Sequence, residues 1–451
     1  MKNDNKIKGA NDTIFALASG QGRAGVAVIR ISGPGSGGVL KKLTKRVLPP
    51  PRQAKLRVLV DSDGEKLDEA LVLWFKGSAS FTGEDMAELQ THGSTAVVAC
   101  ISEALFALGI RQAEAGEFTR RAFENGKMDL TEAEGLADLI DADSSGQRRQ
   151  ALRQMQGGLR EVYEGWRDQI LDALAFIEGE IDFPDEDDVP DELAHKAVTG
   201  LKVLERSLES TLADGQRGER IRHGVDIAII GAPNAGKSSI INRLAGRKAA
   251  IVSETPGTTR DIVEVHMTVS GLPIRISDTA GLRDTVDTIE AEGVRRAELR
   301  ATEADIRLAV IDCLDVGPHD DLLALLQNGD FVLVNKIDQH KNRTILNVSR
   351  ETFYISANTG AGFDELLLSL ETKVSKRFGA SEQAGLTRAR HVDCTKKTLL
   401  AIQKAKLALG VAPELAGADL RQALHSIKEL AGETDIEAVL DRVFSSFCIG
   451  K

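Results

Sequence analysis

The first part of the chain alternates short β-rich runs with one apolar helical run. Residues 25–31 and 70–75 are rich in Val, Ile, Leu and aromatic side chains, and residues 96–108 have the length and composition of a helix. Runs of these two kinds, punctuated by polar and glycine-containing segments, predict a mixed α/β domain over about residues 12–125.

From about residue 130 the apolar positions recur at three- and four-residue steps instead, which predicts long amphipathic helices. Residues 183–192 interrupt this pattern with two prolines in an acidic run, and a second helical pattern follows over 201–212. The interruption predicts an exposed turn between two antiparallel helices. The apolar stripe of the first helix comprises Leu159, Val162, Trp166, Ile170, Leu174, Ile177 and Ile181.

A third pattern begins at residues 225–230, an apolar run that ends at a glycine. Later apolar runs, at 274–277, 306–311 and 331–334, alternate with helical segments, which predicts a doubly wound, mainly parallel sheet. The chain is helical again after about residue 377, so the sheet domain is expected to be inserted into a helical domain. The predicted domains are 1–125 (α/β), 126–217 (helical, first part), 218–377 (inserted sheet domain) and 378–451 (helical, second part).

Composition supports a soluble globular protein, with 42% hydrophobic and 28% charged residues among 451. The net charge of -11 argues against a polybasic nucleic-acid or membrane-surface protein. We see neither an apolar run long enough to span a bilayer nor a secretory signal. The four cysteines, Cys100, Cys313, Cys394 and Cys448, are widely spaced, which favours a reduced cytoplasmic protein.

Residues 231–238, GAPNAGKS, match the phosphate-binding pattern G-x-x-x-x-G-K-[ST] and lie between an apolar strand and an amphipathic helix. In such a loop the backbone N–H groups surround the phosphates at a helix N-terminus. Lys237 is expected to reach the β- and γ-phosphates, and Ser238 to bind Mg²⁺. The nucleotide contacts predicted here are Asn234, Ala235, Gly236, Lys237, Ser238 and Ser239.

Three further motifs follow strands in the order expected of a GTP-binding domain. Asp278, Thr279, Ala280 and Gly281 suit Mg²⁺ and the γ-phosphate. Asn335, Lys336 and Asp338 suit the base: the carboxylate accepts two N–H groups from guanine, which adenine does not offer. Ser356, Ala357 and Asn358 would support the base through backbone N–H groups. Together these motifs predict a GTP switch over residues 231–358.

Hydrolysis must use an unusual water-orienting group, because Leu282 stands where Ras-like enzymes carry glutamine. Glu290 and Arg283 are the nearby candidates, although both could be solvated loop charges. No arginine finger is evident. Asn234 and the loop over residues 255–261 could instead coordinate a monovalent cation.

At this point the whole chain resembles the MnmE (TrmE) family of tRNA-modification GTPases. The resemblance spans nearly the full length. Its motifs lie at 25–33 (GVAVIRISG), 81–93 (FTGEDMAELQTHG), 116–123 (GEFTRRAF), 127–130 (KMDL), 181–186 (IDFPDE), 257–261 (GTTRD) and 447–451 (FCIGK).

The resemblance implies an N-terminal domain that binds a 5-formyl-tetrahydrofolate-type donor and forms a homodimer. The folate contacts implied are Arg30, Glu88, Lys127 and Lys451; the first two, taken alone, would be read as surface charges. It also implies K⁺ ligands at Asn234, Ser253, Thr255 and Thr258, and Mg²⁺ ligands at Ser238 and Thr259. Glu290 would orient water, Arg283 would assist the switch, and K⁺-dependent pairing of two G domains would stimulate GTP hydrolysis.

The family acts with an FAD-dependent partner, MnmG, at carbon 5 of the tRNA wobble uridine. Cys448 lies in the terminal motif proposed to aid that chemistry, against the alternative of an unreactive thiol in a frayed tail. A competing hypothesis is a ribosome- or RNA-binding switch in which GTP only times assembly. Such a switch would usually carry a separate RNA-binding module, and none is obvious in this sequence.

Overall fold

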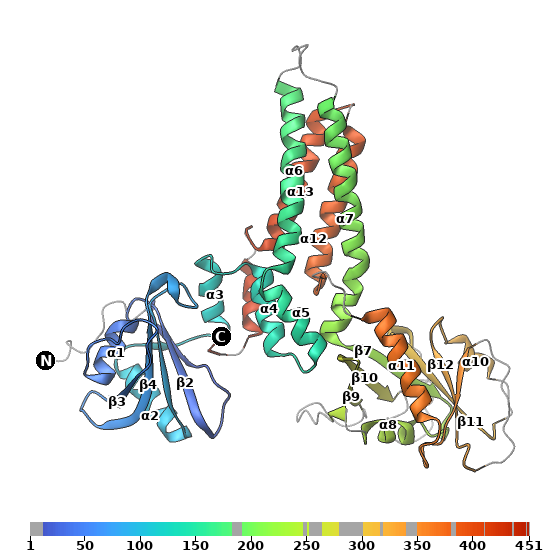
Figure 1. Ribbon diagram of the computed structural model, residues 1–451, viewed down its shortest axis with the longest axis horizontal. Helices are drawn as coiled ribbons and strands as arrows, with labels where there is room; N and C mark the ends of the chain where they lie inside the picture. Colours follow the sequence, from blue (N-terminus) through green and yellow to red (C-terminus); the bar gives the residue numbers. More distant parts are fainter. Residues whose placement is uncertain are drawn as a thin grey trace, which may run out of the picture. The chain divides into compact units, whose positions relative to one another are not determined.

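Two compact units make up the computed structural model, Met1–Ala137 with Leu424–Lys451, and Asp138–Ala423 (Figure 1). Each unit is described by itself. The residues that the structure describes are 12–182, 192–246, 250–251, 264–278, 301–315, 319–339, 350–379, 385–409, 411–434, 437–447 and 449–450.

The first unit contains a six-stranded sheet in the order β3-β4-β5-β2-β1-β6. Its pairs are antiparallel except for the parallel pair of β1 with β6. The strands are β1 (Ile14–Leu17), β2 (Ala24–Ser32), β3 (Lys55–Val60), β4 (Lys66–Phe75), β5 (Met86–Gly93) and β6 (Arg111–Gln112). The helices described with this unit are α1 (Ser36–Thr44), the short 3-10 helix η2 (Gly77–Ala79), α2 (Thr95–Ala107), α3 (Glu117–Glu124), α4 (Leu130–Ile140) and α14 (Glu437–Ser445).

The two faces of this sheet differ in cover. One face packs on α1 and α2 in a core that includes Leu40, Ile101 and Trp74. On the other face, over β3 and β4, Leu56 and Leu71 are exposed and directly paired across the strands. This alternation of buried and exposed residues is typical of an antiparallel sheet with one face on the core. We call the exposed side of β2 to β5 the open face.

Helix α3 is fixed by a partly buried carboxylate. Glu117 accepts hydrogen bonds from Arg111 at 2.5 and 2.8 Å, from Arg121 at 2.9 Å and from the Glu114 backbone N–H at 3.0 Å. Burial alone would raise the pKa of Glu117, but these donors outweigh it and lower the pKa to about 2. The carboxylate is therefore ionised in the fold at every ordinary pH.

We expect Glu117→Gln to destabilise the protein by about 1–2 kcal/mol at pH 7. A carboxylate with a lowered folded-state pKa stabilises the fold above its unfolded pKa, near 4.5, and this contribution is lost as the pH falls toward about 2. The difference between wild type and variant should therefore shrink below pH 4.5. Chemical denaturation at pH 7, 5 and 3.5 measures it. A difference that stays constant with pH would show that the variant acts through packing instead.

The second unit begins with helices, and the first long helix buries most of the apolar stripe predicted from the sequence, although Val162 is only half-buried. Leu159, Trp166, Ile170, Leu174 and Ile177 are all buried. The Trp166 indole N–H donates to Ser207 Oγ at 3.0 Å and joins the first two long helices. Figure 1 shows these helices side by side with the two that follow the sheet domain. The helices are α5 (Ser145–Met155), α6 (Gly158–Asp182), α7 (Glu192–His223), α12 (Ala389–Ala408) and α13 (Pro413–Ala431). The predicted acidic turn lies outside the described residues.

The sheet of this unit has seven strands in the order β13-β12-β11-β7-β10-β9-β8. Its strands are β7 (Val225–Gly231), β8 (Ala250–Ile251), β9 (Glu264–Val269), β10 (Leu272–Asp278), β11 (Ile306–Asp312), β12 (Phe331–Asn335) and β13 (Glu351–Tyr354), and its helices are α8 (Lys237–Ala245), α10 (Asp320–Ala324) and α11 (Phe363–Phe378). Strands β13 to β10 pair in parallel, which confirms the doubly wound domain inserted between helices. Strand β9 was not predicted from the sequence. It is an antiparallel strand on which exposure alternates, and its six residues mix polar and apolar side chains without a continuous apolar run.

The sheet domain enters and leaves the helices at one place. Gly218, near the end of α7, packs so closely on the segment before α12 that a Cβ there would lie 2.5 Å from the Leu386 carbonyl oxygen. Only glycine allows backbones to approach this closely. The two connections of the inserted domain are therefore adjacent.

Candidate nucleotide and folate sites

The phosphate-binding loop joins β7 to α8 at the C-terminal edge of the sheet. This is the edge where ligands bind in open α/β sheets, and β7 lies at the point where the strand order reverses. Asn234 and Gly236 have φ angles of 63° and 96°, in the left-handed region. The Lys237 ammonium is nearly buried and donates to the carbonyl oxygens of Gly231 and Ala232, each at 2.9 Å. The lysine is thus held at the loop where phosphates are expected.

Asn335, at the end of β12, connects the phosphate loop to the loop after β13. Its Nδ2 donates to the Ala235 carbonyl at 2.9 Å, and its Oδ1 accepts the Ala357 backbone N–H at 3.0 Å. Its side chain is 1% exposed, so both hydrogen bonds are made away from water. Three motifs that are far apart in sequence therefore meet at one amide.

The Asp338 carboxylate is ordered by the same loop. Ser356 Oγ donates to its Oδ1 at 2.6 Å, and Asn358 Nδ2 lies 3.4 Å from its Oδ2. The hydrogen bond from Ser356 lowers the pKa of Asp338, so the carboxylate is an acceptor at neutral pH. Lys336 instead pairs with Asp312, at 2.7 Å. Asp312 was not among the candidates predicted from the sequence.

Asn335, Lys336 and Asp338 line a cleft of about 480 Å³. The lining consists of Gly236, Ser239, Asn242, Arg243, Asn335, Lys336, Asp338, Gln339, Ala357 and Asn358. Seven of the ten were candidates from the sequence, whereas Asn242, Arg243 and Gln339 were not. Helical spacing gave a signal for two of them, because residues 242 and 243 follow Ser239 at three and four positions and so share its face.

Asn234 lies elsewhere. With Ala235 it lines a cavity of about 270 Å³ on another side of the phosphate loop, together with Asp312, Asp315 and His319. Ser238 lies in the first turn of α8, and Asp278 ends β10 in parallel register with Ile229 of β7. The other candidates of the sheet domain lie outside the described residues: Ser253, Thr255, Thr258, Thr259, Thr279, Ala280, Gly281, Arg283 and Glu290.

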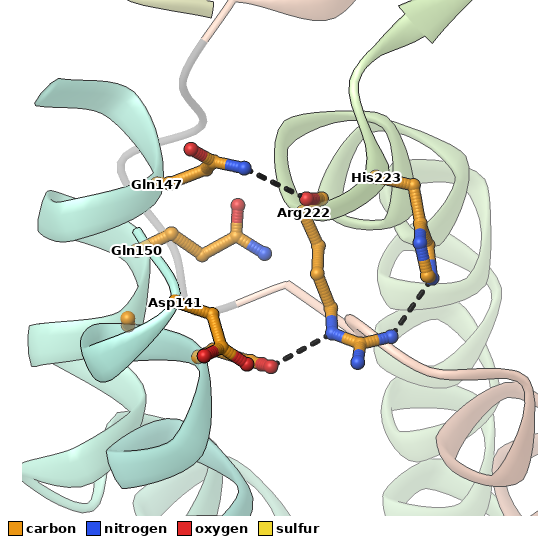
Figure 2. Close-up of a pocket in the computed structure, with 7 residues that line it drawn as sticks. Asp141, Gln147, Gln150, Arg222 and His223 are labelled. Carbon is orange, nitrogen blue, oxygen red and sulfur yellow. Dashed lines mark hydrogen bonds and ion pairs between the residues drawn. The ribbon is translucent and has the colours of Figure 1, made fainter. Parts of the chain in front are cut away.

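A smaller cavity of about 90 Å³ lies between α5 and the last turn of α7 (Figure 2). Asp138 Oδ1 accepts hydrogen bonds from Arg222 and Arg388, each at 2.8 Å. Gln147 and Gln150 donate to the α7 carbonyls of Arg222 and Gly218, each at 2.9 Å. The cavity is too small for a nucleotide. Gln147 satisfies a carbonyl of the last turn of α7, where the helix offers no N–H partner of its own, and Gln150 adds a contact one turn earlier.

The candidate folate residues of the first unit lie around the loop that follows β4. Arg30 and Glu88 are opposite each other on β2 and β5, and Arg30 Nε donates to Glu88 Oε1 at 2.8 Å. The Arg30 guanidinium also lies 5.9 Å from the centre of the Phe81 ring. Lys127 Nζ donates to the Ser78 carbonyl at 2.7 Å. Arg30 and Glu88 are thus a half-buried pair on the open face, not separate surface charges.

The C-terminal segment packs within the same unit. Phe447 is buried with Leu130 and Phe444, and Ile449 forms an isolated antiparallel bridge with Ala115. The segment next to Phe447 is therefore held against the N-terminal part of the chain. Cys448 and Lys451 lie outside the described residues. In the part of the chain that the structure describes, no helix is long and apolar enough to cross a membrane.

Comparison with known proteins covers nearly the whole sequence. Residues 13–127 match the family model described as the GTP-binding protein TrmE N-terminus, and residues 130–448 match that of the MnmE helical domain. The tRNA modification GTPase MnmE of Maricaulis maris is 53% identical over 441 residues, 98% of this chain and 100% of the relative. That of Paramagnetospirillum magneticum is 48% identical over 444 residues, with the same coverage. The G domain of the T. maritima FeoB iron transporter, at 25% identity and a TM-score of 0.26, aligns with 33% of this chain and 98% of its own. The two family models and the full-length relatives show that the chain belongs to the MnmE family of tRNA modification GTPases.

Proposed function

We propose that the 480 Å³ cleft binds GTP and that its hydrolysis drives modification of carbon 5 of the tRNA wobble uridine, giving the cmnm5 or nm5 type. The observation that carries the nucleotide assignment is that the buried Asn335 joins the phosphate loop to the loop after β13, and that Ser356 of this loop holds the Asp338 carboxylate. A carboxylate beside ordered backbone groups recognises guanine, because guanine offers a pair of N–H donors that adenine lacks.

Mg²⁺ and K⁺ complete this proposal. Ser238 and Asp278 offer the hydroxyl and carboxylate oxygens that Mg²⁺ prefers, and Thr259 is the further proposed ligand. When bound, Mg²⁺ neutralises charge that develops on the phosphates. The left-handed backbone at Asn234 places an amide in the phosphate loop, where we propose a K⁺ site shared with Ser253, Thr255 and Thr258. Glu290 would then orient water, with Arg283 assisting, when two G domains pair.

The first unit supplies the proposed one-carbon site. A guanidinium and an ammonium suit the carboxylates of a 5-formyl-tetrahydrofolate, and a carboxylate suits its pterin N–H edge. Arg30, Glu88 and Lys127 offer these groups, and Lys451 is the fourth proposed contact. The exposed leucines of the open face, Leu56 and Leu71, are suited to homodimer formation. MnmG and tRNA are the proposed partners, with Cys448 proposed to aid the chemistry.

The expected test result is a GTP turnover rate that rises when K⁺ replaces Na⁺ at constant ionic strength, and a melting temperature that rises with 5-formyl-tetrahydrofolate. The first follows from a cation stabilising transition-state charge, and the second from binding to the folded state alone. Arg30→Met should remove the folate shift while sparing K⁺-dependent turnover. If neither effect appears, the chain would be better described as a GTP-timed RNA-binding switch.

A further inference from the structure

We propose that Arg243, on α8, is a positioning residue that sets the base specificity of the cleft by holding the loop after β13. This inference rests on the proposed GTP site. Arg243 Nε donates to the Ala357 carbonyl at 2.7 Å, and its Nη2 donates to the Asn358 carbonyl. One guanidinium thus holds two successive carbonyls of a segment more than one hundred residues away in sequence.

The hydrogen bond from Arg243 to the Asn358 carbonyl also helps to position the Asp338 carboxylate. In a planar trans peptide, a carbonyl and the following N–H point in opposite directions. With the Asn358 carbonyl turned toward Arg243, the Thr359 N–H points away and donates to Ser356 Oγ at 3.0 Å. Ser356 Oγ in turn donates to Asp338 Oδ1 at 2.6 Å. One peptide plane and one hydroxyl therefore connect Arg243 to the carboxylate.

The hydrogen bond from Arg243 to the Ala357 carbonyl orients a second group of the base site, the Asn358 backbone N–H. The Ala357 carbonyl points toward Arg243, so the Asn358 N–H, which belongs to the same peptide unit, points away from Arg243. Guanine has an acceptor at its 6-oxo group and donors at N1 and N2, so recognition needs both an ordered N–H and an ordered carboxylate. Arg243 orders both through backbone that it contacts directly.

Arginine suits this role better than lysine does. Its planar group presents several N–H donors in a fixed arrangement, whereas an ammonium is a compact charge on a flexible chain. Arg243 also lines the cleft beside Asp338 and Asn358. Its removal would therefore leave the loop after β13 less ordered at the place where the base is proposed to bind. A purely structural arginine would support the stability of α8 and leave the choice of base unchanged.

The experiment compares Arg243→Met, Arg243→Lys and wild type in the full-length protein, by competition of GDP, IDP and ADP against a fluorescent GDP analogue. For Arg243→Met we expect the ratio of the ADP to the GDP dissociation constant to fall about tenfold, which corresponds to the loss of about 1.4 kcal/mol of discrimination. Arg243→Lys should recover part of the ratio, since one carbonyl can still be held.

The matched control is Arg275→Met, which removes two hydrogen bonds to Asp226, at 2.7 and 2.8 Å, in the same domain but away from the cleft. It should lower the melting temperature and leave the base ratio unchanged. An unchanged ratio in Arg243→Met would overturn the proposal. Asp338→Asn is measured alongside, to separate failure of the Arg243 proposal from failure of the proposed GTP site. If Asp338→Asn leaves the GDP affinity unchanged, the guanine site itself has been assigned to the wrong residues.

Discussion

Replacing Asp338 by asparagine is expected to weaken GTP binding by about 10²- to 10⁴-fold, the largest loss of affinity that we expect from a single polar substitution. In the proposed site the carboxylate accepts two guanine N–H groups, and the hydrogen bond from Ser356 lowers the pKa of Asp338, which keeps the carboxylate ionised at neutral pH. An amide offers one acceptor and turns a donor toward the guanine N–H groups. Isothermal titration with GTP and GDP measures the effect.

The same variant should change which base is preferred. Xanthine carries a carbonyl oxygen where guanine carries its 2-amino group, so it can accept a hydrogen bond from the new amide. We therefore expect xanthosine triphosphate to bind Asp338→Asn more tightly than it binds wild type. Asp226→Asn, which removes a carboxylate paired with Arg275 in the same domain, is the matched control and should leave both affinities unchanged. Unchanged GTP affinity in Asp338→Asn would refute the guanine assignment.

Gly236→Ala should abolish most nucleotide binding and destabilise the sheet domain by about 2–4 kcal/mol. Gly236 has a φ of 96°, and a Cβ there would lie 2.2 Å from Asn335 Nδ2. The added methyl group must therefore displace the amide that joins the phosphate loop to the loop after β13, or flatten the phosphate loop itself. Either change disturbs both halves of the cleft.

Gly246→Ala provides the control within the same stretch of chain. Gly246 has a φ of −73°, and its nearest neighbour to an added Cβ is the Asn242 carbonyl oxygen at 3.5 Å. We expect this variant to bind GDP normally and to unfold within about 0.5 kcal/mol of wild type. Denaturation curves and GDP titrations of both variants are compared. Equal behaviour of the two alanines would contradict a special role for the Gly236 backbone.

The sequence was informative wherever a feature depends on neighbours in the chain. The buried parallel strand β12 is a continuous apolar run, β7 is interrupted only at Asp226, and the stripe of α6 follows helical spacing, so these elements could be predicted. Motifs that follow such strands must meet at one sheet edge. Asn335, Asp338 and Ser356 do meet there, as the structure shows.

The features that could not be predicted are contacts between residues that are distant in sequence. Arg243 resembles any exposed helical arginine until its partners, 114 and 115 residues away, are known. Arg30 and Glu88 looked like separate charges because only the register of β2 against β5 places them opposite each other. Strand β9 was not predicted because it is an antiparallel strand that buries alternate residues and therefore has no continuous apolar run.

The close approach of Gly218 to Leu386 bears on how such a chain could have arisen. Joining the ends of a long flexible segment costs entropy that grows with its length. A domain whose two connections already lie together imposes little of that cost on the host, so the helices around it can retain their packing whether the guest is present or not. We therefore expect the point where Gly218 meets Leu386 to be the place at which the helical bundle accepts a different inserted domain with the least change to its own packing.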